Sequence, residues 1–323
     1  MNPVIEFQDV CFSYTATAPG NAKSGKAMSF AKPGKSTSFT KSGKAAARDA
    51  SRASQEQTYT MQDVSFAIEP GEFVAIIGSN GAGKTTATKL MNGLLKPSSG
   101  CVSFQGVSTG DVKTSQLARQ VGMLFQDPDR QICQTSVYDE LALGLRAAGI
   151  SEADIEKRVG CIARDFGFDT ACDPFSLSRG QRQNLALACI IVGHPQVLVL
   201  DEPTCGLDYR ECTYIMRRVS ELNAQGTTVV MVTHDMELVI DYADRLLVMA
   251  DGKLIADGRP KDIFRNPGVM HQAGILPPQM IDLSQRLDLP VAKNVGEMVE
   301  CITKVISACT NPGKANTQTE GAF

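Results

Sequence analysis

The stretch from Phe73 to Leu95 constrains the fold more than any other part of the chain. Five apolar residues, Phe73 to Ile77, predict a buried strand, and a glycine-rich turn leads from it into a helix that should end at Lys96-Pro97. The apolar face of that helix is predicted to consist of Leu90, Met91, Leu94 and Leu95. A strand, a tight turn and a helix in this order point to an α/β protein.

The turn itself has the pattern Gly78-x4-Gly83-Lys84-Thr85 between the strand and the helix. Glycines let backbone N–H groups point inward at an anion, and the start of a helix adds the positive end of its dipole. Lys84 is expected to reach terminal phosphates, and the Thr85 hydroxyl is expected to hold magnesium. A glycine turn that binds nothing is the alternative, and the agreement of strand, spacing and Lys-Thr pair argues against it.

Composition and charge limit the class of protein. The chain has 323 residues, of which 43% are hydrophobic, so we expect one large domain with an appendage, or two domains. The net charge is −3, and basic residues are concentrated between Thr15 and Gln57, which leaves the remaining sequence mildly acidic. An acidic body argues against nucleic acid as the main partner.

Neither a membrane span nor a cysteine framework is indicated. The N-terminus lacks the charged head and apolar run of a secretory signal, and no run approaches the roughly 18 apolar residues that cross a bilayer. The ten cysteines are scattered singly, which suggests no zinc site or disulfide framework and fits a reduced compartment. A role at a membrane is therefore expected to come through partners.

Residues 15–57 are rich in Ala, Ser, Gly, Lys and Thr and have few large apolar side chains. Such a segment cannot bury enough apolar surface to offset its chain entropy, so we interpret it as a disordered insertion. Contact of its basic charge with anionic lipid or an acidic surface is an alternative to a merely solvated loop. If the loop is solvated, its deletion should leave folding intact.

Polar residues follow three further predicted strands. Gln126 follows a strand that ends at Phe125, Asp201 and Glu202 follow the strand Val197 to Leu200, and His234 comes soon after the strand Thr228 to Val232. Because ligands of open α/β sheets bind at the carboxyl ends of strands, we expect these side chains near the glycine loop. Two adjacent carboxylates need a compensating cation there, which supports a metal-bound phosphate. A structural role remains the alternative for a lone histidine or glutamine.

Residues 136–170 repeat apolar side chains every four positions, with a cap at Ser151, and predict an inserted helical subdomain. The following segment, FSLSRGQ, leads into an apolar helix from Leu185 to Val192. Serine and glycine at such a helix start indicate either an anion-binding end or a simple capped helix.

Other strands are predicted at residues 4–14, 58–68 and 101–107, and a hairpin turn is predicted at Asp251-Gly252. Phe12 and Tyr14 close the first of these strands and are candidates for stacking on a nucleotide base. Ordinary packing is the alternative for both aromatic residues.

These motifs together resemble the ATP-binding subunit of ABC transporters over residues 1–258, apart from the insertion. The matching segments are GSNGAGKT (Walker A), Gln126 (Q-loop), LSRGQ (signature), VLVLDEPT (Walker B), GLD (D-loop) and His234 (switch histidine). The signature separates ABC proteins from other P-loop families. The resemblance implies an α/β P-loop NTPase fold, namely an ABC ATPase domain with an antiparallel β lobe and a helical subdomain, followed by a small C-terminal extension at 259–323.

The resemblance also implies roles for individual residues. Glu202 would polarise the attacking water, His234 would position it, and Lys84 and Gln126 would complete the catalytic set. Magnesium would be arranged by Thr85, Gln126 and Asp201. ATP would be bound by Tyr14, by Gly78, Ser79, Asn80, Gly81, Ala82, Gly83, Lys84, Thr85 and Thr86, and by Ser178, Gly180 and Gln181 of a neighbouring subunit.

Two segments, LFQDPDRQICQTSVYDELALG and AGILPPQMIDLSQRL, are similar more narrowly to the ATPases of energy-coupling-factor (ECF) importers of vitamins or of cobalt and nickel. This implies a head-to-tail dimer with a second ABC ATPase subunit, identical or different. It also implies attachment to a transmembrane subunit and to a substrate-binding membrane subunit, at the cytoplasmic face of the membrane. The cargo stays open because a separate membrane protein selects it in such systems.

One departure from the family pattern is Arg179, which takes the place of a glycine in the usual LSGGQ signature. Another is the insertion directly after Tyr14, on which the stacking prediction depends. Two alternatives stay open: a soluble ABC ATPase without transport, and a nucleotide-gated subunit with weak hydrolysis in a heterodimer. The absence of a second cassette and of a long heptad arm argues against the first, and Glu202 with His234 argues against the second.

Overall fold

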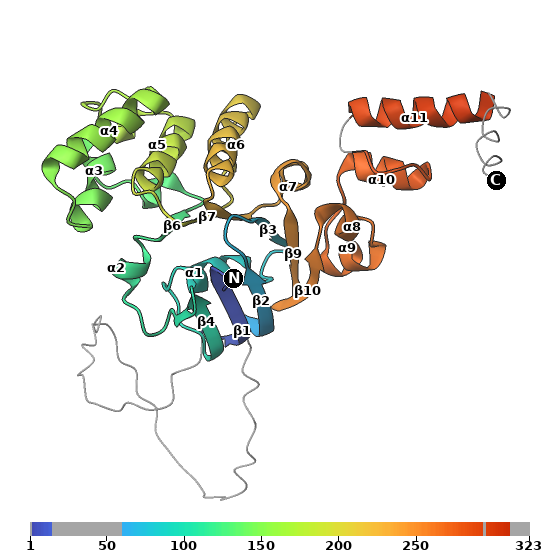
Figure 1. Ribbon diagram of the computed structural model, residues 1–323, viewed down its shortest axis with the longest axis horizontal. Helices are drawn as coiled ribbons and strands as arrows, with labels where there is room; N and C mark the ends of the chain where they lie inside the picture. Colours follow the sequence, from blue (N-terminus) through green and yellow to red (C-terminus); the bar gives the residue numbers. More distant parts are fainter. Residues whose placement is uncertain (1, 15–59, 293–294, 311–323) are drawn as a thin grey trace, which may run out of the picture.

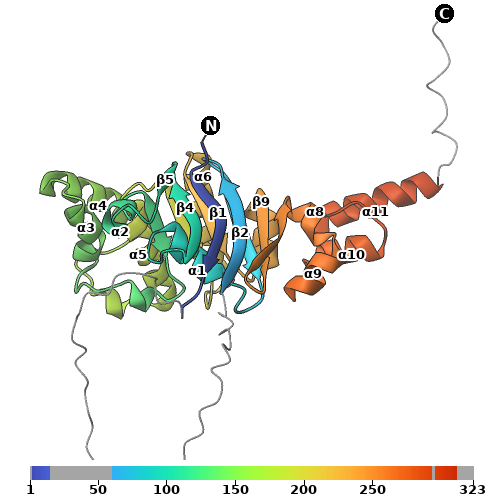
Figure 2. The same cartoon turned by 90° about the horizontal axis from the view of Figure 1, so that it is seen from below.

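Two β-sheets organise the computed structural model, which describes residues 2–14, 60–292 and 295–310 (Figures 1 and 2). The strands of this part of the chain are β1 (Ile5–Phe12), β2 (Met61–Ile68), β3 (Phe73–Gly78), β4 (Ser99–Phe104), β5 (Val107–Ser108), β6 (Val121–Leu124), β7 (Val197–Asp201), β8 (Thr228–Val232), β9 (Arg245–Ala250) and β10 (Lys253–Gly258). One sheet has the order β2-β1-β4-β5 and is antiparallel. The other has the order β10-β9-β3-β8-β7-β6, in which only the edge strand β10 is antiparallel to its neighbour.

Helices surround the parallel sheet. Those of the described residues are α1 (Lys84–Met91), α2 (Thr114–Leu117), α3 (Val137–Ala147), α4 (Glu152–Phe166), α5 (Arg179–Ile191), α6 (Tyr209–Ala224), α7 (Met236–Tyr242), α8 (Pro260–Phe264), α9 (Pro267–Ala273), α10 (Gln279–Arg286) and α11 (Val295–Thr310), with short 3₁₀ helices η1 (Pro128–Arg130) and η2 (Pro174–Ser176). Within the residues that the structure describes, no helix is both long enough and apolar enough to cross a membrane.

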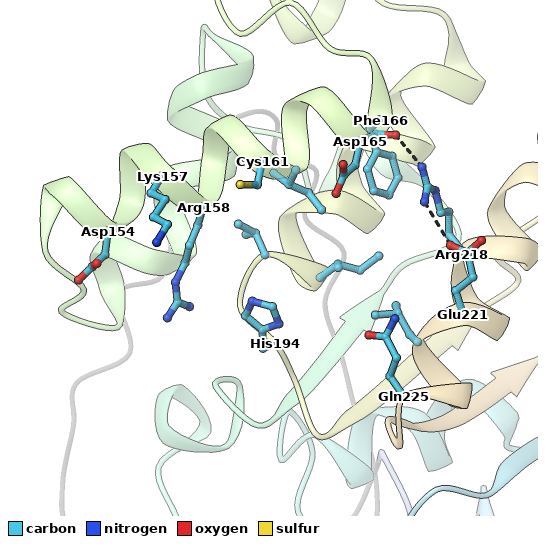
Figure 3. Close-up of a pocket in the computed structure, with 14 residues that line it drawn as sticks. Asp154, Lys157, Arg158, Cys161, Asp165, Phe166, His194, Arg218, Glu221 and Gln225 are labelled. Carbon is cyan, nitrogen blue, oxygen red and sulfur yellow. Dashed lines mark hydrogen bonds and ion pairs between the residues drawn. The ribbon is translucent and has the colours of Figure 1, made fainter.

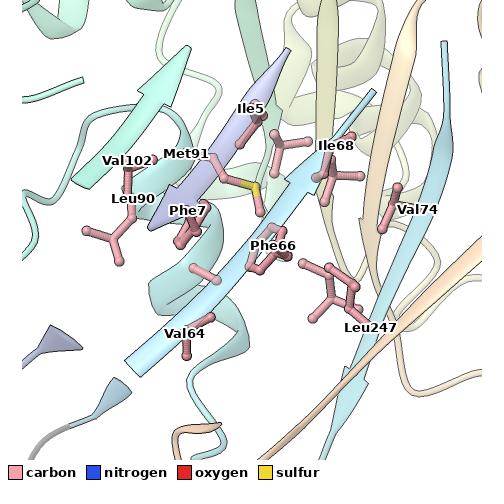
Figure 4. Close-up of a cluster of buried hydrophobic side chains, with 14 of the residues drawn as sticks. Ile5, Phe7, Val64, Phe66, Ile68, Val74, Leu90, Met91, Val102 and Leu247 are labelled. Carbon is pink, nitrogen blue, oxygen red and sulfur yellow. The ribbon is translucent and has the colours of Figure 1, made fainter. Parts of the chain in front are cut away.

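Strand β3 is covered on both faces, which explains its uninterrupted apolar sequence. Val74 and Ile76 pack against the antiparallel sheet and α1, in the cluster of Figure 4. The other face of β3 packs against α5 and α6 through Phe73, and against α7 and the C-terminal helices through Ala75 and Ile77. The loop that follows β3 is therefore anchored by a strand that is buried in three clusters.

Helices α3 and α4 form the helical subdomain predicted at residues 136–170, and α5 shares a core with them. Each of the first two begins at a serine whose hydroxyl accepts a hydrogen bond from the helix: Ser136 from the Asp139 amide, and Ser151 from the Asp154 amide. The predicted cap at Ser151 is thus confirmed. Figure 1 places α3 and α4 at one end of the molecule, next to α5.

The C-terminal extension begins inside the main core. Ile263, Phe264, Met270 and Ile281 of α8 to α10 belong to the same buried cluster as Ile77 of β3. Helix α11 lies beside α10 at the opposite end of the molecule from α3 and α4 (Figures 1 and 2). The boundary at residue 258 remains a prediction, because the described contacts run continuously across it.

Two predicted boundaries were wrong. Helix α1 ends at Met91, with Asn92 as its cap and Gly93 at φ 69°, so the chain leaves the helix before Leu94, which is 50% exposed. The strand predicted at 101–107 is two strands, because Gln105 and Gly106 at positive φ form a turn between β4 and β5. The helix start predicted at the serine and glycine of the LSRGQ segment is confirmed, since α5 begins at Arg179 with Ser178 as its cap.

The predicted insertion at 15–57 lies outside the described residues. Its flanks are close together, because the Thr60 amide donates a hydrogen bond of 2.8 Å to the carbonyl oxygen of Phe12. The predicted hairpin is confirmed: β9 and β10 pair across Asp251 and Gly252, which both have positive φ.

Candidate functional site

Four parallel strands bring the predicted residues to one edge of the sheet. The strands β3, β8, β7 and β6 are neighbours, so their carboxyl ends lie along the same side. The glycine loop follows β3, Asp201 ends β7, His234 follows β8 and Gln126 follows β6. The residues that were expected near the glycine loop therefore share an edge with it.

The backbone of the glycine loop can be formed only with glycine at its first position. Gly78 has a φ of 153°, and a Cβ atom there would lie 2.1 Å from the carbonyl oxygen of Met249. Gly83, with φ 99°, is the residue before α1, and no side chain caps this helix. The first amides of α1 therefore have no side-chain acceptor and are available to an anion.

Lys84 is buried inside the loop that precedes it. Its Nζ donates hydrogen bonds to the carbonyl oxygens of Gly78, at 2.8 Å, and Ser79, at 3.0 Å. Burial lowers the pKa of Lys84, and the negative charges of Glu202 and Asp201 oppose this effect. The ammonium group is thus held where the loop, α1 and the two acids converge.

Asp201 is the buried acid of the pair. Burial raises its pKa and Glu202 adds to the rise, whereas a hydrogen bond with the Thr85 side chain lowers it. Carboxylate and hydroxyl oxygens are ligands that magnesium accepts, and a cation would relieve the cost of the buried charge. Asp201 and Thr85 therefore fit a magnesium ion. The described residues contain no group of three or more His, Cys, Asp or Glu side chains placed to hold a metal, so an ion here would depend on this mixed set and on phosphate.

Glu202 has its carboxylate held from two sides. Gln126 Nε2 donates to Oε2 at 3.1 Å, and His234 Nε2 lies 2.9 Å from Oε1. The backbone of Glu202 has a φ of 50°, which is uncommon for a residue with a side chain, and its amide donates to the carbonyl oxygen of Val232. Sparsely populated backbone conformations of this kind concentrate at functional sites.

A cavity of about 480 Å³ opens beside this carboxylate. It is lined by Glu202, Thr204, Cys205, Thr233, His234, Asp235 and Met236. The structure thus brings together Gln126, Glu202 and His234 by direct contact, and Asp201 with Thr85 and Lys84 beside them. The roles of these residues stay predictions.

The signature residues lie at the start of α5 and take their contacts from within the subunit. The Ser178 hydroxyl accepts a hydrogen bond from the Gln181 amide, and the Gln181 side chain accepts one from the Ser178 amide, which makes a complete capping box. Gly180 is buried, and a Cβ atom there would collide with the Glu211 carboxylate. In the described part of the chain, none of the three is hydrogen-bonded to the glycine loop.

The two candidates for stacking on a base, Phe12 and Tyr14, differ in how exposed their side chains are. Phe12 is buried in the core between the sheets, so its predicted stacking role was wrong. Tyr14 is 62% exposed, meets the Phe12 ring edge to face, and has its hydroxyl 3.4 Å from the Thr86 hydroxyl at the start of α1. Tyr14 therefore stays a candidate for contact with a base, beside the glycine loop.

Sequence reasoning missed the contacts of α5 with the loop after Glu202. Arg179 Nη2 donates to the carbonyl oxygen of Cys205 at 3.3 Å, and Gln183 Nε2 donates to that of Pro203 at 3.2 Å. The spacing of four residues puts both side chains on one face of the helix, and this was the available signal. What that face contacts is not readable from a local pattern.

A second cavity, of about 510 Å³, lies between α4 and α6, and no predicted site residue lines it (Figure 3). Its wall includes Arg218, whose guanidinium group stacks on Phe166 and Tyr214 and donates to the carbonyl oxygen of Asp165. Arg218 therefore joins the end of α4 to α6. This cavity belongs to the joint between the helical subdomain and the sheet, and the nucleotide site lies elsewhere.

The fold and the site define the class: the protein is a P-loop ATPase with the architecture of an ABC ATP-binding domain. The family model for the ABC transporter matches residues 61–205. A putative ABC transporter ATP-binding protein of Caldanaerobacter subterraneus subsp. tengcongensis is 39% identical over 258 residues, which are 79% of this chain and 45% of that protein. One of Pyrococcus abyssi is 38% identical over 246 residues, which are 76% of this chain and 94% of that protein.

The chain therefore belongs to the family of ABC transporter ATP-binding proteins. It spans less than half of the Caldanaerobacter relative and almost all of the Pyrococcus one. The fold class expected from the sequence is confirmed.

Solved structures agree with this assignment. cbiO1 from Clostridium perfringens, described as part of the ABC transporter complex cbiONQ, is 28% identical with a TM-score of 0.65, over 88% of this chain and 100% of that chain. The ATP-binding cassette MJ0796, in a dimeric post-hydrolysis state bound to ADP and Pi, shares the fold at 24% identity with a TM-score of 0.60, over 79% and 98% of the two chains.

Proposed function

We propose that this chain binds ATP with magnesium and hydrolyses it as one of two ABC ATPase subunits that drive import through an ECF-type membrane complex. The observation that carries this proposal is the Glu202 carboxylate. It is held by Gln126 and His234 at the sheet edge where the glycine loop begins α1. A carboxylate so placed can orient and deprotonate a water molecule against a terminal phosphate.

The contacts of the surrounding residues support a role for each of them in this proposal. Lys84 and the uncapped amides of α1 would hold the phosphates, and Tyr14 would contact the base. Thr85 and Asp201, with Gln126, would hold magnesium, which would neutralise phosphate charge when bound. His234 would keep the Glu202 carboxylate aimed at the water, because its Nε2 already contacts Oε1. This is phosphoryl transfer by positioning and charge neutralisation, without a covalent intermediate.

The signature segment supports the proposal of a partner ATPase. Ser178 and Gly180 are predicted to face a nucleotide and, among the described residues, have no hydrogen bond to the glycine loop of their own subunit. We therefore propose that they complete the site of a second ABC ATPase chain, either another copy or a related subunit. Each nucleotide would then bridge two positive helix ends and draw the chains together.

A membrane partner is proposed for a groove beside the Gln126 loop. This groove, of about 550 Å³, lies between the helical subdomain and the sheet, and its wall includes Leu94, Phe125, Leu145, Ala148 and Ile190. Its largely apolar wall suits an apolar segment of a transmembrane subunit, and Phe125 directly precedes Gln126, so occupancy could be sensed at the site. The likeness to cbiO1 and the segment AGILPPQMIDLSQRL support an ECF-type complex for vitamins or for cobalt and nickel.

The substitution Glu202→Gln tests the catalytic role. It keeps the size of the side chain but removes the base, so ATP turnover by the assembled complex should fall about 100-fold or more. Binding of ATP should persist, and the closed dimer should accumulate, which light scattering after size exclusion would detect. Glu156→Gln on the exposed face of α4 is the matched control. Unchanged turnover by Glu202→Gln would show that another group activates the water.

The substitution Leu94→Glu tests the groove. Leu94 is 50% exposed in the groove wall, and Val107 is equally accessible at 54% on β5, outside the groove. A charge at Leu94 should abolish co-purification with the membrane subunits, whereas Val107→Glu should retain it. Equal recovery of membrane subunits by both variants would place the contact elsewhere.

A further inference from the structure

The start of α5 is joined to the loop that carries Glu202. Arg179 Nη2 donates to the carbonyl oxygen of Cys205 at 3.3 Å. The Cys205 amide in turn donates to the carbonyl oxygen of Glu202 at 3.2 Å. Cys205 therefore connects the Arg179 guanidinium group to the backbone of Glu202, the proposed catalytic acid, through two hydrogen bonds.

Two further contacts fix this loop in place. Gly206 has a φ of 73°, and the Arg179 guanidinium lies about 3.2 Å from where its Cβ atom would be, so the loop runs directly against the arginine. Gln126 Nε2 lies 3.8 Å from Cys205 Sγ and also donates to Glu202. Arg179 and Gln126 thus both contact Cys205, one at its carbonyl oxygen and the other at its sulfur. Glycine, the usual signature residue at position 179, has no side chain to do this.

We propose that Arg179 is a positioning residue that links the two nucleotide sites of the ATPase dimer through its own subunit; this inference rests on the proposed head-to-tail dimer. Ser178 and Gly180, on either side of Arg179, face the nucleotide of the partner. Glu202 acts on the nucleotide of its own subunit. Engagement of the partner's nucleotide moves the start of α5, and Arg179 passes that movement to the Glu202 loop.

Mixed dimers of two differently tagged copies separate this role from direct contact with phosphate. Each dimer carries Glu202→Gln in one copy, so only the other copy has an active carboxylate. Arg179→Ala is then placed either in the copy with the active Glu202 or in the opposite copy. In the first case it alters the loop of the active carboxylate, and in the second it alters the signature that completes the active site.

The inference predicts that Arg179→Ala lowers kcat about fivefold when it lies in the copy with the active Glu202, and less than twofold in the opposite copy. Arg179→Lys in the same copy should recover part of kcat, because its ammonium group can still reach a carbonyl oxygen. ATP affinity and melting temperature of the isolated chain should stay unchanged, which separates positioning from damage to the fold. Arg164→Ala, on the exposed face of α4, serves as the control substitution.

Two results would overturn the inference. A larger loss in the opposite copy would mean that the guanidinium acts on the partner's phosphates. Equal losses, or none, would mean that the contact with Cys205 transmits nothing. Wild-type dimers without ATPase activity would instead overturn the proposed function itself.

Discussion

The starts of α1 and α5 look alike in sequence and differ in what they can do. Both follow a turn with glycine or serine, and both were predicted to bind phosphate at a helix N-terminus. Helix α1 begins after Gly83 with no side-chain cap, and Lys84 lies buried beside it. Helix α5 begins with a complete capping box, in which Ser178 and Gln181 satisfy one another.

The starts of α1 and α5 differ in which backbone amides remain available to bind an anion. At α1 the first-turn amides have no side-chain acceptor, and a positive charge with two acids stands next to them. At α5 the amides of Ser178 and Gln181 are already hydrogen-bonded within the cap, and Gly180 is pressed against Glu211. Helix α1 is therefore expected to hold a phosphate by itself, whereas α5 is expected only to add to a phosphate that another group holds. This asymmetry supports the proposed site shared between two subunits.

The largest expected effect is on ATP affinity of the isolated chain. Lys84→Ala should weaken binding about 30-fold, because one charge-assisted contact contributes about 2 kcal/mol. Ser178→Ala should leave the same affinity within about twofold, because α5 is expected to serve the partner's nucleotide. Calorimetric titration with magnesium and ATP, at a concentration where the chain is monomeric, measures both variants.

The proposed difference between the two helix starts would be wrong if Ser178→Ala weakened ATP binding as strongly as Lys84→Ala. The two helix starts would then serve one nucleotide in the same subunit. Lys84→Arg is a useful second variant, since it keeps the charge but enlarges a side chain that is buried between two carbonyl oxygens.

An intermediate effect is expected on stability. Ser178→Ala removes the capping box of α5 and should lower the free energy of unfolding by about 1 kcal/mol, or the melting temperature by about 3 °C. Ser178→Thr should retain most of the stability, because its hydroxyl can still accept from the Gln181 amide. An Ala variant as stable as the wild type would mean that the serine is kept for a ligand and not for the helix.

The parts of the site that local physics determines were predictable from the sequence. The apolar runs of β3, β7 and β8 led directly to the residues at their carboxyl ends, and the cap at Ser151 followed from residue type and spacing. The end of α1 was not predictable in this way, because Leu94 continues the apolar period after Gly93 has already turned the chain. Contacts such as Arg179 with Cys205 depend on how α5 packs on the sheet, and no local pattern specifies that.

The smallest expected effect concerns Asp201, the acid beside α1. Its pKa is raised in the folded chain above the ordinary value of 3.8, mainly by burial. The folded state therefore binds more protons than the unfolded state in this range, so stability falls as pH rises from about 3.8 through the raised pKa and stays lower above it. Asp201→Asn should remove this loss and raise the melting temperature at pH 7 by about 2 °C in the absence of nucleotide.

The pH dependence sharpens the contrast between the two helix starts. The gain in melting temperature from Asp201→Asn should disappear at pH 3.5, where the aspartate of the wild type is protonated. The loss in melting temperature from Ser178→Ala should be the same at both pH values, because a hydroxyl does not titrate there. Thermal unfolding of the three chains across this range measures the difference. If Asp201→Asn is instead less stable at pH 7, then the attraction of Lys84 and the hydrogen bond with Thr85 outweigh the cost of burial. In that case the α1 site is assembled by its charges before any nucleotide binds, and Lys84→Ala should lose stability as well as affinity.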